Sequence, residues 1–324
     1  MNSFFRAAIL PVGCLLLMGA SCGDNPLNSS ASSHDELTYY VDEGFRVEDA
    51  SNPGAKLSDD DVLLLYENRV GHGNSIGSAS ENSDWLDFDL INDSADIAAF
   101  RALELPDGTY RAYGPDATKG LGGEVIGFTS KSSTDGENFT EDEGYRYYLQ
   151  EEDYGSSGVY ELFVDSPGNV VLLYIGNMGS KGKETEHRNT IRRAYSTDGG
   201  WTFEFDRGNI LGGEDDVASH AYVDQKILSL GDDRWRLITM KQGGLYSFIS
   251  EDDGYSFELE DFELTPEDFS EGTGYDIVGL HDPVMIQLPD GRFRIYVAAK
   301  TSGVDEDGGP KYYMLSATDR KSVV

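Results

Sequence analysis

One stretch, HDPVMIQLPDGRFRIY at residues 281–296, decides the fold. It combines a β-run, an Asp-Gly hairpin signal and a second β-run. The same unit recurs nearly position for position at 223–238 and again at 99–113, and looser copies lie at 159–174 and 52–66. Self-similarity with a period of tens of residues indicates a repeat architecture.

A third β-run that ends near a serine follows each copy of the unit. These runs lie at residues 76–80, 125–130, 191–196, 245–250 and 312–316. The spacing suits three- or four-stranded antiparallel blades, and helical periodicity is hard to find between them. Five such units predict an all-β fold, a five-bladed β-propeller with antiparallel blades.

The last unit stops early, because residues 320–324 are too few for a fourth strand. Residues 37–41 and 45–47 are β-rich and precede the first unit. We expect them to close the ring as the outer strand of the last blade, which would remove an exposed sheet edge. The alternative is a truncated reading frame with an incomplete fifth blade. The propeller would then span residues 37–324 as one domain.

The turn after the third β-run has a signature of its own. Residues 196–203 and 250–257 both match S-x-D-x-G-x-[TS]-F, and residues 133–139 carry a form one residue shorter. In such a turn the Asp accepts backbone N–H bonds, Gly supplies positive φ, and the aromatic side chain packs between sheets. The signature resembles the Asp-box of sialidases and related propeller glycosidases, and it predicts a structural role for these aspartates.

The charge excludes some classes of partner. The chain has 25 Lys and Arg against 59 Asp and Glu, a formal net charge of -34. Nucleic-acid binding needs clustered basic residues, so it is excluded, and docking onto an anionic membrane surface is disfavoured. We expect much of the acid to lie in turns and on the solvated surface.

The N-terminus predicts export. Residues 1–21 contain a single Arg, no acid and a short apolar run, as in a signal peptide. The run ends in Gly-Ala-Ser before Cys22, which resembles the lipobox of bacterial lipoproteins, although Gly19 replaces the usual Leu. We expect a lipid-anchored protein of the cell envelope, with residues 22–36 as a tether and the lipid as its only membrane contact. Simple secretion and a buried N-terminal helix are the alternatives. Removal of Cys14 with the leader would leave no intramolecular disulfide.

Unusual polar residues map to one rim of the predicted propeller. The carboxylates fall at or just before inner strands, and the histidines fall there or in loops between second and third strands. The set is Asp96, Glu161, Asp224, Asp282, His72, His187, His220 and His281. The histidines could bind substrate hydroxyls or hold Ca²⁺ through water. A zinc site is less favoured, because these histidines lack close spacing.

The chain resembles the five-bladed propeller glycosidases, the arabinanase, xylosidase and invertase group. The Asp282-Pro283 opening and the phrase LPDGRFR at 288–294 carry the resemblance. It implies three inner-strand carboxylates: a base or nucleophile, an orienting Asp and a Glu acid. Glu161 matches the position that the resemblance implies for the acid. Asp96 lies near the position that it implies for the orienting Asp. Asn52 replaces the usual first-blade Asp, so Asp49, Asp224 or Asp282 would take that role.

Several functions remain open at this point. The leading hypothesis is an exported glycosidase that acts on a neutral oligosaccharide or polysaccharide, with Ca²⁺ as its one candidate cofactor. The second is a surface lipoprotein that binds glycan or protein without catalysis. Asn52 favours this hypothesis, because it replaces the usual first-blade Asp. A polysaccharide lyase and a sialidase are further alternatives. A sialidase would need an arginine triad, for which Arg46, Arg101 and Arg193 are available. We expect a monomer.

Overall fold

The computed structural model describes residues 38–58, 60–69, 73–93, 98–116, 125–153, 155–176, 190–213, 216–305 and 308–319. The predicted signal peptide, the tether, Cys22, His72, Asp96 and His187 lie outside these residues and stay predictions. In the described part of the chain, no helix is long and apolar enough to cross a membrane.

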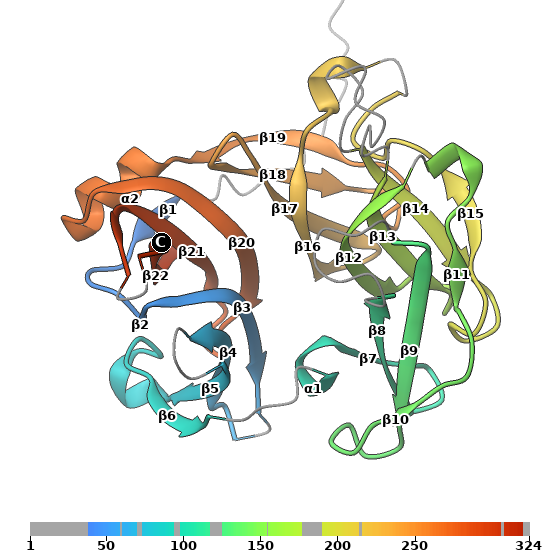
Figure 1. Cartoon of the computed structure of the whole chain (residues 1–324), viewed down its shortest axis with the longest axis horizontal. Coiled ribbons are helices and arrows are strands. Elements are labelled where there is room, and N and C mark those ends of the chain that lie inside the picture. The colour runs from blue at the N-terminus through green and yellow to red at the C-terminus, as the bar shows by residue number, and fades with distance from the viewer. Residues whose placement is uncertain are drawn as a thin grey trace, which may run out of the picture. The chain divides into compact units, whose positions relative to one another are not determined.

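The described strands form five antiparallel sheets, which are the predicted blades (Figure 1). Blade 1 contains β3 (Ala50–Leu57), β4 (Leu63–Arg69), β5 (Gly73–Ala79) and β6 (Asp89–Asn92). Blade 2 contains β7 (Ala102–Glu104), β8 (Tyr110–Pro115), β9 (Gly127–Ser133), β10 (Thr140–Glu141) and β11 (Tyr147–Tyr148). Blade 3 contains β12 (Ser156–Val164), β13 (Val170–Gly176), β14 (Thr190–Ser196) and β15 (Glu204–Arg207).

The last two blades complete the ring. Blade 4 contains β16 (Val223–Gly231), β17 (Arg234–Lys241), β18 (Gly244–Ser250) and β19 (Glu258–Leu264). Blade 5 contains β20 (Ile277–Gln287), β21 (Phe293–Val304), β22 (Pro310–Asp319), β1 (Tyr39–Val41) and β2 (Val47–Glu48). Inner strands contact their neighbours in the order β3, β20, β16, β12 and β7, and a short helix after blade 1 contacts β3. The protein is therefore a five-bladed β-propeller.

The N-terminal segment closes the ring as predicted. Strand β1 pairs antiparallel with β22, with Tyr39 opposite Asp319. The Asp42 carboxylate accepts hydrogen bonds from the hydroxyls of Ser316 (2.6 Å) and Thr318 (2.8 Å). It also lies 3.4 Å from Nε of the fully buried Arg294. Blade 5 thus joins the first strand of the described chain to the last.

Hydrophobic contacts between adjacent blades form the core. Four clusters of buried side chains lie at the interfaces of blades 4 and 5, 3 and 4, 2 and 3, and 5 and 1. Between blades 1 and 2, the rings of Tyr66 and Phe100 lie 5.5 Å apart. Each blade buries both faces of its sheet against its neighbours, so the ring positions the inner strands around one centre.

The repeated turn has the expected hydrogen bonds. Asp198 accepts the backbone N–H groups of Trp201 (3.0 Å) and Thr202 (2.9 Å), and Asp252 accepts that of Ser256 (2.9 Å). Gly199, Gly200 and Gly254 all have positive φ. The aromatic side chains that end the two full signatures, Phe203 and Phe257, are buried between blades.

Two helices correct the sequence-based expectation. Helix α2 (Pro266–Thr273) follows blade 4 and buries Phe269 against blade 5. Its start is a capping box, in which Thr265 and Asp268 each bond to the other's backbone N–H. Helix α1 (Ala98–Arg101) takes up the beginning of the 99–113 copy, so Ala99 is helical and the inner strand of blade 2 begins only at Ala102. The other short helices in the described residues are η1 (Glu81–Ser83), η3 (Glu151–Asp153) and η5 (Val217–Ser219).

Candidate active site

Four inner strands share a β-bulge with a left-handed residue. The residues are Asn52 (φ 52°), Gly158 (φ 80°), Asp224 (φ 56°) and Asp282 (φ 49°). Each lies where the register of the inner strand with the second strand shifts. Gly, Asn and Asp tolerate this conformation best, and a bulge re-aims the side chain that it carries. The four positions are equivalent in blades 1, 3, 4 and 5.

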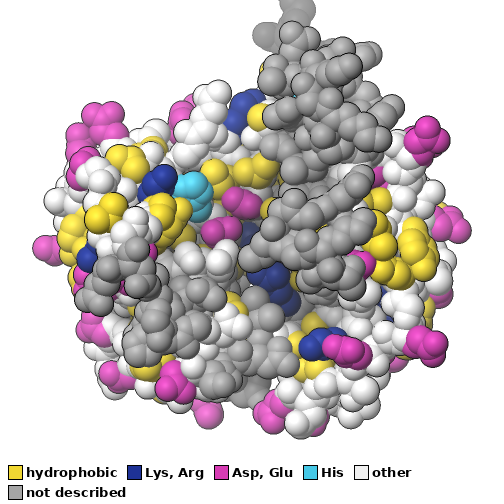
Figure 2. Space-filling model, in the orientation of Figure 1, with side chains coloured by type: hydrophobic (Ala, Val, Ile, Leu, Met, Phe, Trp, Pro, Cys, Tyr) yellow, Lys and Arg dark blue, Asp and Glu magenta, His cyan; other side chains and the backbone are white. Residues whose placement is uncertain are grey.

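These bulges surround a cavity of about 450 Å³, within the range of roughly 300–1,000 Å³ typical of small-molecule sites. Basic and acidic side chains meet in the hollow at the centre of the face shown in Figure 2. The polar side chains that line the cavity are Asn52, Arg101, Glu161, Asp224, Gln225, Lys226 and Asp282. The aromatic part of the cavity wall is formed by Tyr66, Phe100 and Tyr160. A cavity with both aromatic surface and converging charged groups suits a polar ligand that has apolar faces.

Glu161 forms an ion pair across the cavity wall. Its carboxylate lies 2.6 Å from Nζ of Lys226, which is on the inner strand of the next blade. The side chains are 22% and 29% exposed, so water screens the pair only in part. A protonated Glu161 would lose this ion pair. The geometry therefore suits a fixed carboxylate that orients Lys226 or a ligand hydroxyl.

Asp224 and Asp282 interact electrostatically. They occupy equivalent bulges of adjacent blades and line the same cavity. Burial, and after it the nearby charge of Asp282, raises the pKa of Asp224 to about 6. A carboxyl group with this pKa is partly protonated near neutral pH, so it can donate a proton.

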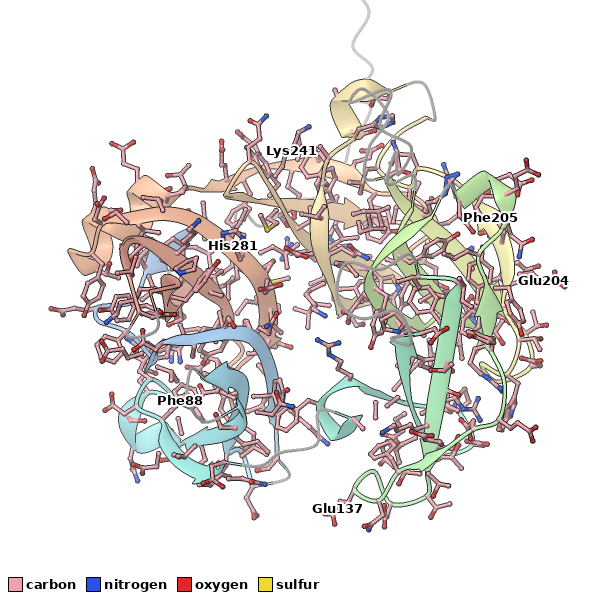
Figure 3. All side chains as sticks on the ribbon, viewed as in Figure 1. Phe88, Glu137, Glu204, Phe205, Lys241 and His281 are labelled. Atoms are coloured by element: carbon pink, nitrogen blue, oxygen red, sulfur yellow. The ribbon has the colours of Figure 1, made fainter. Side chains whose placement is uncertain are left out.

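Asp282 has different surroundings. Burial raises its pKa, while the charges of His281, Lys226 and Arg101 act in the opposite direction. His281 precedes it on β20 (Figure 3), and its ring packs edge-on against Tyr312 at 5.8 Å. Burial lowers the pKa of His281. Lys226 acts on both carboxyls, whereas the charge of Arg101 acts on Asp282 and not on Asp224, which favours the ionised form of Asp282 over that of Asp224.

The structure brings together only part of the predicted site. Glu161, Asp224 and Asp282 line the same cavity. They lie within β12, β16 and β20, whereas we expected positions at or just before the strand starts. His281 adjoins the cavity through Asp282, and His220 is buried in the segment before β16 and is not one of the residues that line the cavity.

Lys226 and Arg101 were not predicted to line this cavity. Lys226 follows Asp224 by two positions on a predicted strand, a spacing that places side chains on one face and was a usable signal. Arg101 had no such signal, because it belongs to α1 rather than to a strand.

The described residues contain no group of three or more His, Cys, Asp or Glu side chains that could hold a metal ion. Two of the four predicted rim histidines lie outside these residues, so Ca²⁺ binding stays a prediction.

Solved structures of glycoside hydrolases are similar to this fold. A thermostable family-43 glycoside hydrolase matches with a TM-score of 0.60 and 10% identity, over 88% of this chain and 94% of that chain. The catalytic domain of the Coprinopsis cinerea GH62 α-L-arabinofuranosidase matches with a TM-score of 0.55 and 8% identity, over 87% and 97%. The α-L-arabinofuranosidase of Lactobacillus brevis matches with a TM-score of 0.54 and 10% identity, over 85% and 92%. The expected fold resemblance is confirmed.

In sequence, no protein-family model matches the chain, and no curated protein is similar to it. At identities this low, the structural similarity establishes the fold, while function has to be argued from the site.

Proposed function

We propose that this protein hydrolyses glycosidic bonds in the central cavity, with Asp224 and Asp282 as its acid and base. The observation that carries the proposal is the pair of bulge-held carboxylates on adjacent blades, whose surroundings favour different protonation states. Glycoside hydrolysis needs one carboxyl that donates a proton and one carboxylate that stays ionised. The similarity to solved glycoside hydrolases supports this reaction class.

In this proposal, Asp224 donates its proton to the glycosidic oxygen as the bond to the anomeric carbon breaks. Water supplies the hydroxyl group of the new reducing end, and its proton goes to Asp282. Transfer of that proton to solvent, and uptake of one by Asp224, restores the starting state. No other reactant is required.

Asp224 is a better candidate for the acid than Glu161, which we expected from the family resemblance. Glu161 makes its ion pair with Lys226 only in the ionised form. We therefore assign Glu161 to substrate positioning. Asp96, the expected orienting residue, precedes α1 and lies outside the described residues, so its role stays a prediction.

A second function, glycan binding without catalysis, is supported by Asn52. It occupies in blade 1 the bulge position that holds Asp in blades 4 and 5, so the first-blade carboxylate that the resemblance implies is missing. A cavity that recognises sugars through aromatic walls and hydroxyl hydrogen bonds would need no acid and base.

A hydrolysis screen separates these two functions. The probes are 4-nitrophenyl glycosides of pentoses, hexoses and hexuronic acids, together with plant and microbial polysaccharides. Wild type should release product from at least one probe, and Asp282→Asn should lower the rate by roughly 10²–10⁴-fold. Asp232→Asn is the matched control, because Asp232 is exposed and also has positive φ. Hydrolysis that is unaffected by Asp282→Asn, or no hydrolysis of any probe, would contradict the proposal.

We also propose that the chain is exported and anchored through a lipid on Cys22. The leader-like residues 1–21 and the small residues before Cys22 support this proposal. Labelling with radioactive palmitate in a bacterial host should mark wild type and spare Cys22→Ser. Equal labelling of both would contradict it.

A further inference from the structure

Arg101 is a cation in the cavity that has no acidic partner among the described residues. It lies on α1, and its guanidinium carbon lies 5.8 Å from the centre of the Tyr160 ring. The other lining cation, Lys226, is already paired with Glu161. Arg101 lines the same cavity as Asp224 and Asp282, and its charge acts on Asp282.

We propose that the cavity selects a glycan that carries a carboxylate, a hexuronic acid, and that Arg101 binds this carboxylate. The proposal rests on the proposed function only in placing the glycan in this cavity. It departs from our expectation of a neutral substrate, because a guanidinium with no acidic partner among the described residues favours an anionic group over a hydroxyl in a glycan-sized cavity.

The surroundings of Arg101 fit this role. The Tyr160 face supports the guanidinium by a cation–π contact, which leaves its N–H groups available to a ligand. Phe100, the neighbouring residue on α1, packs against Tyr66, and both rings line the cavity. Aromatic wall beside a guanidinium suits a uronic acid, whose ring has an apolar face and whose carboxylate projects from its edge.

Arg101 reaches the cavity from another blade than the carboxyl groups. Glu161, Asp224 and Asp282 lie on blades 3, 4 and 5, whereas Arg101 precedes the inner strand of blade 2. A carboxylate held there would lie near Asp282, on which the charge of Arg101 acts, while the aromatic wall remains available to the sugar ring. The high negative charge of the whole chain would slow the approach of such a glycan at low salt, and it would be screened at physiological ionic strength.

The test is a glycan array probed with the full chain as Asp224→Asn, so that bound glycan is not hydrolysed. Uronate polysaccharides such as homogalacturonan, alginate and glucuronoxylan are printed next to their carboxyl-reduced forms and next to neutral glycans. We expect capture by at least one uronate polysaccharide, with roughly 10- to 100-fold weaker binding after carboxyl reduction. Arg101→Met should lose this preference, Arg101→Lys should keep part of it, and Arg234→Met, at an exposed pair far along the chain, should keep all of it.

Three results would overturn the inference: capture of neutral glycans only, equal capture after carboxyl reduction, or no capture at all. Uronate preference retained by Arg101→Met would overturn the role of Arg101. The proposed hydrolysis is judged separately, with wild type. Arg101-dependent capture without hydrolysis would support this inference and contradict the proposed function. Hydrolysis of neutral glycosides alone would support the proposed function and contradict this inference.

Discussion

Asp224 and Asp282 occupy the equivalent bulges of blades 4 and 5 and line the same cavity, where burial and then the charge of Asp282 raise the pKa of Asp224. The two carboxyl groups therefore interact electrostatically. Two like charges in a buried site disfavour ionisation of both, and Arg101, which acts on Asp282 alone, favours the ionised form of Asp282 and the protonated form of Asp224. A pair of this kind can supply both the acid and the base of a hydrolysis.

Protonation of Asp224 should appear in the stability of the protein. Its pKa is about 6 in the folded chain and about 3.9 in an unfolded one, so the folded state binds the proton more tightly. Stability relative to Asp224→Asn should therefore be highest below pH ~4, fall by about 2 to 3 kcal/mol as the pH rises to ~6, and stay level above that. Urea unfolding of both proteins across this range measures the difference. A difference that does not vary with pH would show that Asp224 titrates normally.

Loss of the Glu161–Lys226 ion pair should weaken substrate binding more than chemistry. Glu161→Gln removes one charge and leaves Lys226 in the cavity wall, so KM should rise by roughly tenfold, as expected for a charge-assisted contact, with a smaller change in kcat. Glu251→Gln is the control, because Glu251 pairs with Arg234 at the exposed surface. A loss of kcat as large as that of Asp282→Asn would return the acid role to Glu161.

Ring closure should depend on Asp42. The change Asp42→Ala removes the carboxylate next to buried Arg294 and two hydroxyl contacts, so we expect a loss of about 3 kcal/mol in unfolding free energy. Glu43→Ala changes the adjacent exposed acid, whose side chain makes no hydrogen bond or ion pair in the described structure, and should cost little. Chemical denaturation compares the two, and equal effects would argue that β1 contributes little to blade 5.

Two neighbouring glycines test the turn between blades 2 and 3. Gly199 and Gly200 have similar φ values, 73° and 80°, so Ala costs about the same backbone strain at each. A Cβ at Gly200 would collide with the hydroxyl of Tyr113, whereas a Cβ at Gly199 would meet nothing within 4 Å. Gly200→Ala should therefore lower stability by about 1 to 3 kcal/mol more than Gly199→Ala. Equal melting temperatures would show that the turn does not pack against blade 2 in solution.

Much of the fold could be predicted because its signals are local. Asp-Gly hairpins and the S-x-D-x-G turn specify strands within a few residues, and their repetition specifies blades. A second repeat went unused: DEGFR at 42–46 and DEGYR at 142–146 each connect the two halves of a split outer strand. Helix α2 was missed although Thr265 and Pro266 are a helix start signal, because the blade pattern on either side led us to expect only strands.

The candidate site was harder to predict, because it depends on contacts between blades. The inner strands of blades 4 and 5 could be aligned by their repeat, which placed Asp224 and Asp282 at equivalent positions. Their electrostatic interaction depends on the ring bringing those strands side by side, and the ion pair of Glu161 with Lys226 spans 65 positions in the chain. No local pattern encodes such distances.

The assignment of Asp224 as the acid is tested most directly by leaving-group dependence. On the sugar that wild type hydrolyses, kcat/KM is measured for 2,4-dinitrophenyl and for alkyl glycosides with wild type, Asp224→Asn and Asp282→Asn. A dinitrophenolate leaves without protonation, so Asp224→Asn should keep most activity on that glycoside and lose roughly 10²–10⁴-fold on the alkyl one, while Asp282→Asn should lose activity on both. Equal losses on both glycosides in Asp224→Asn would contradict the assignment.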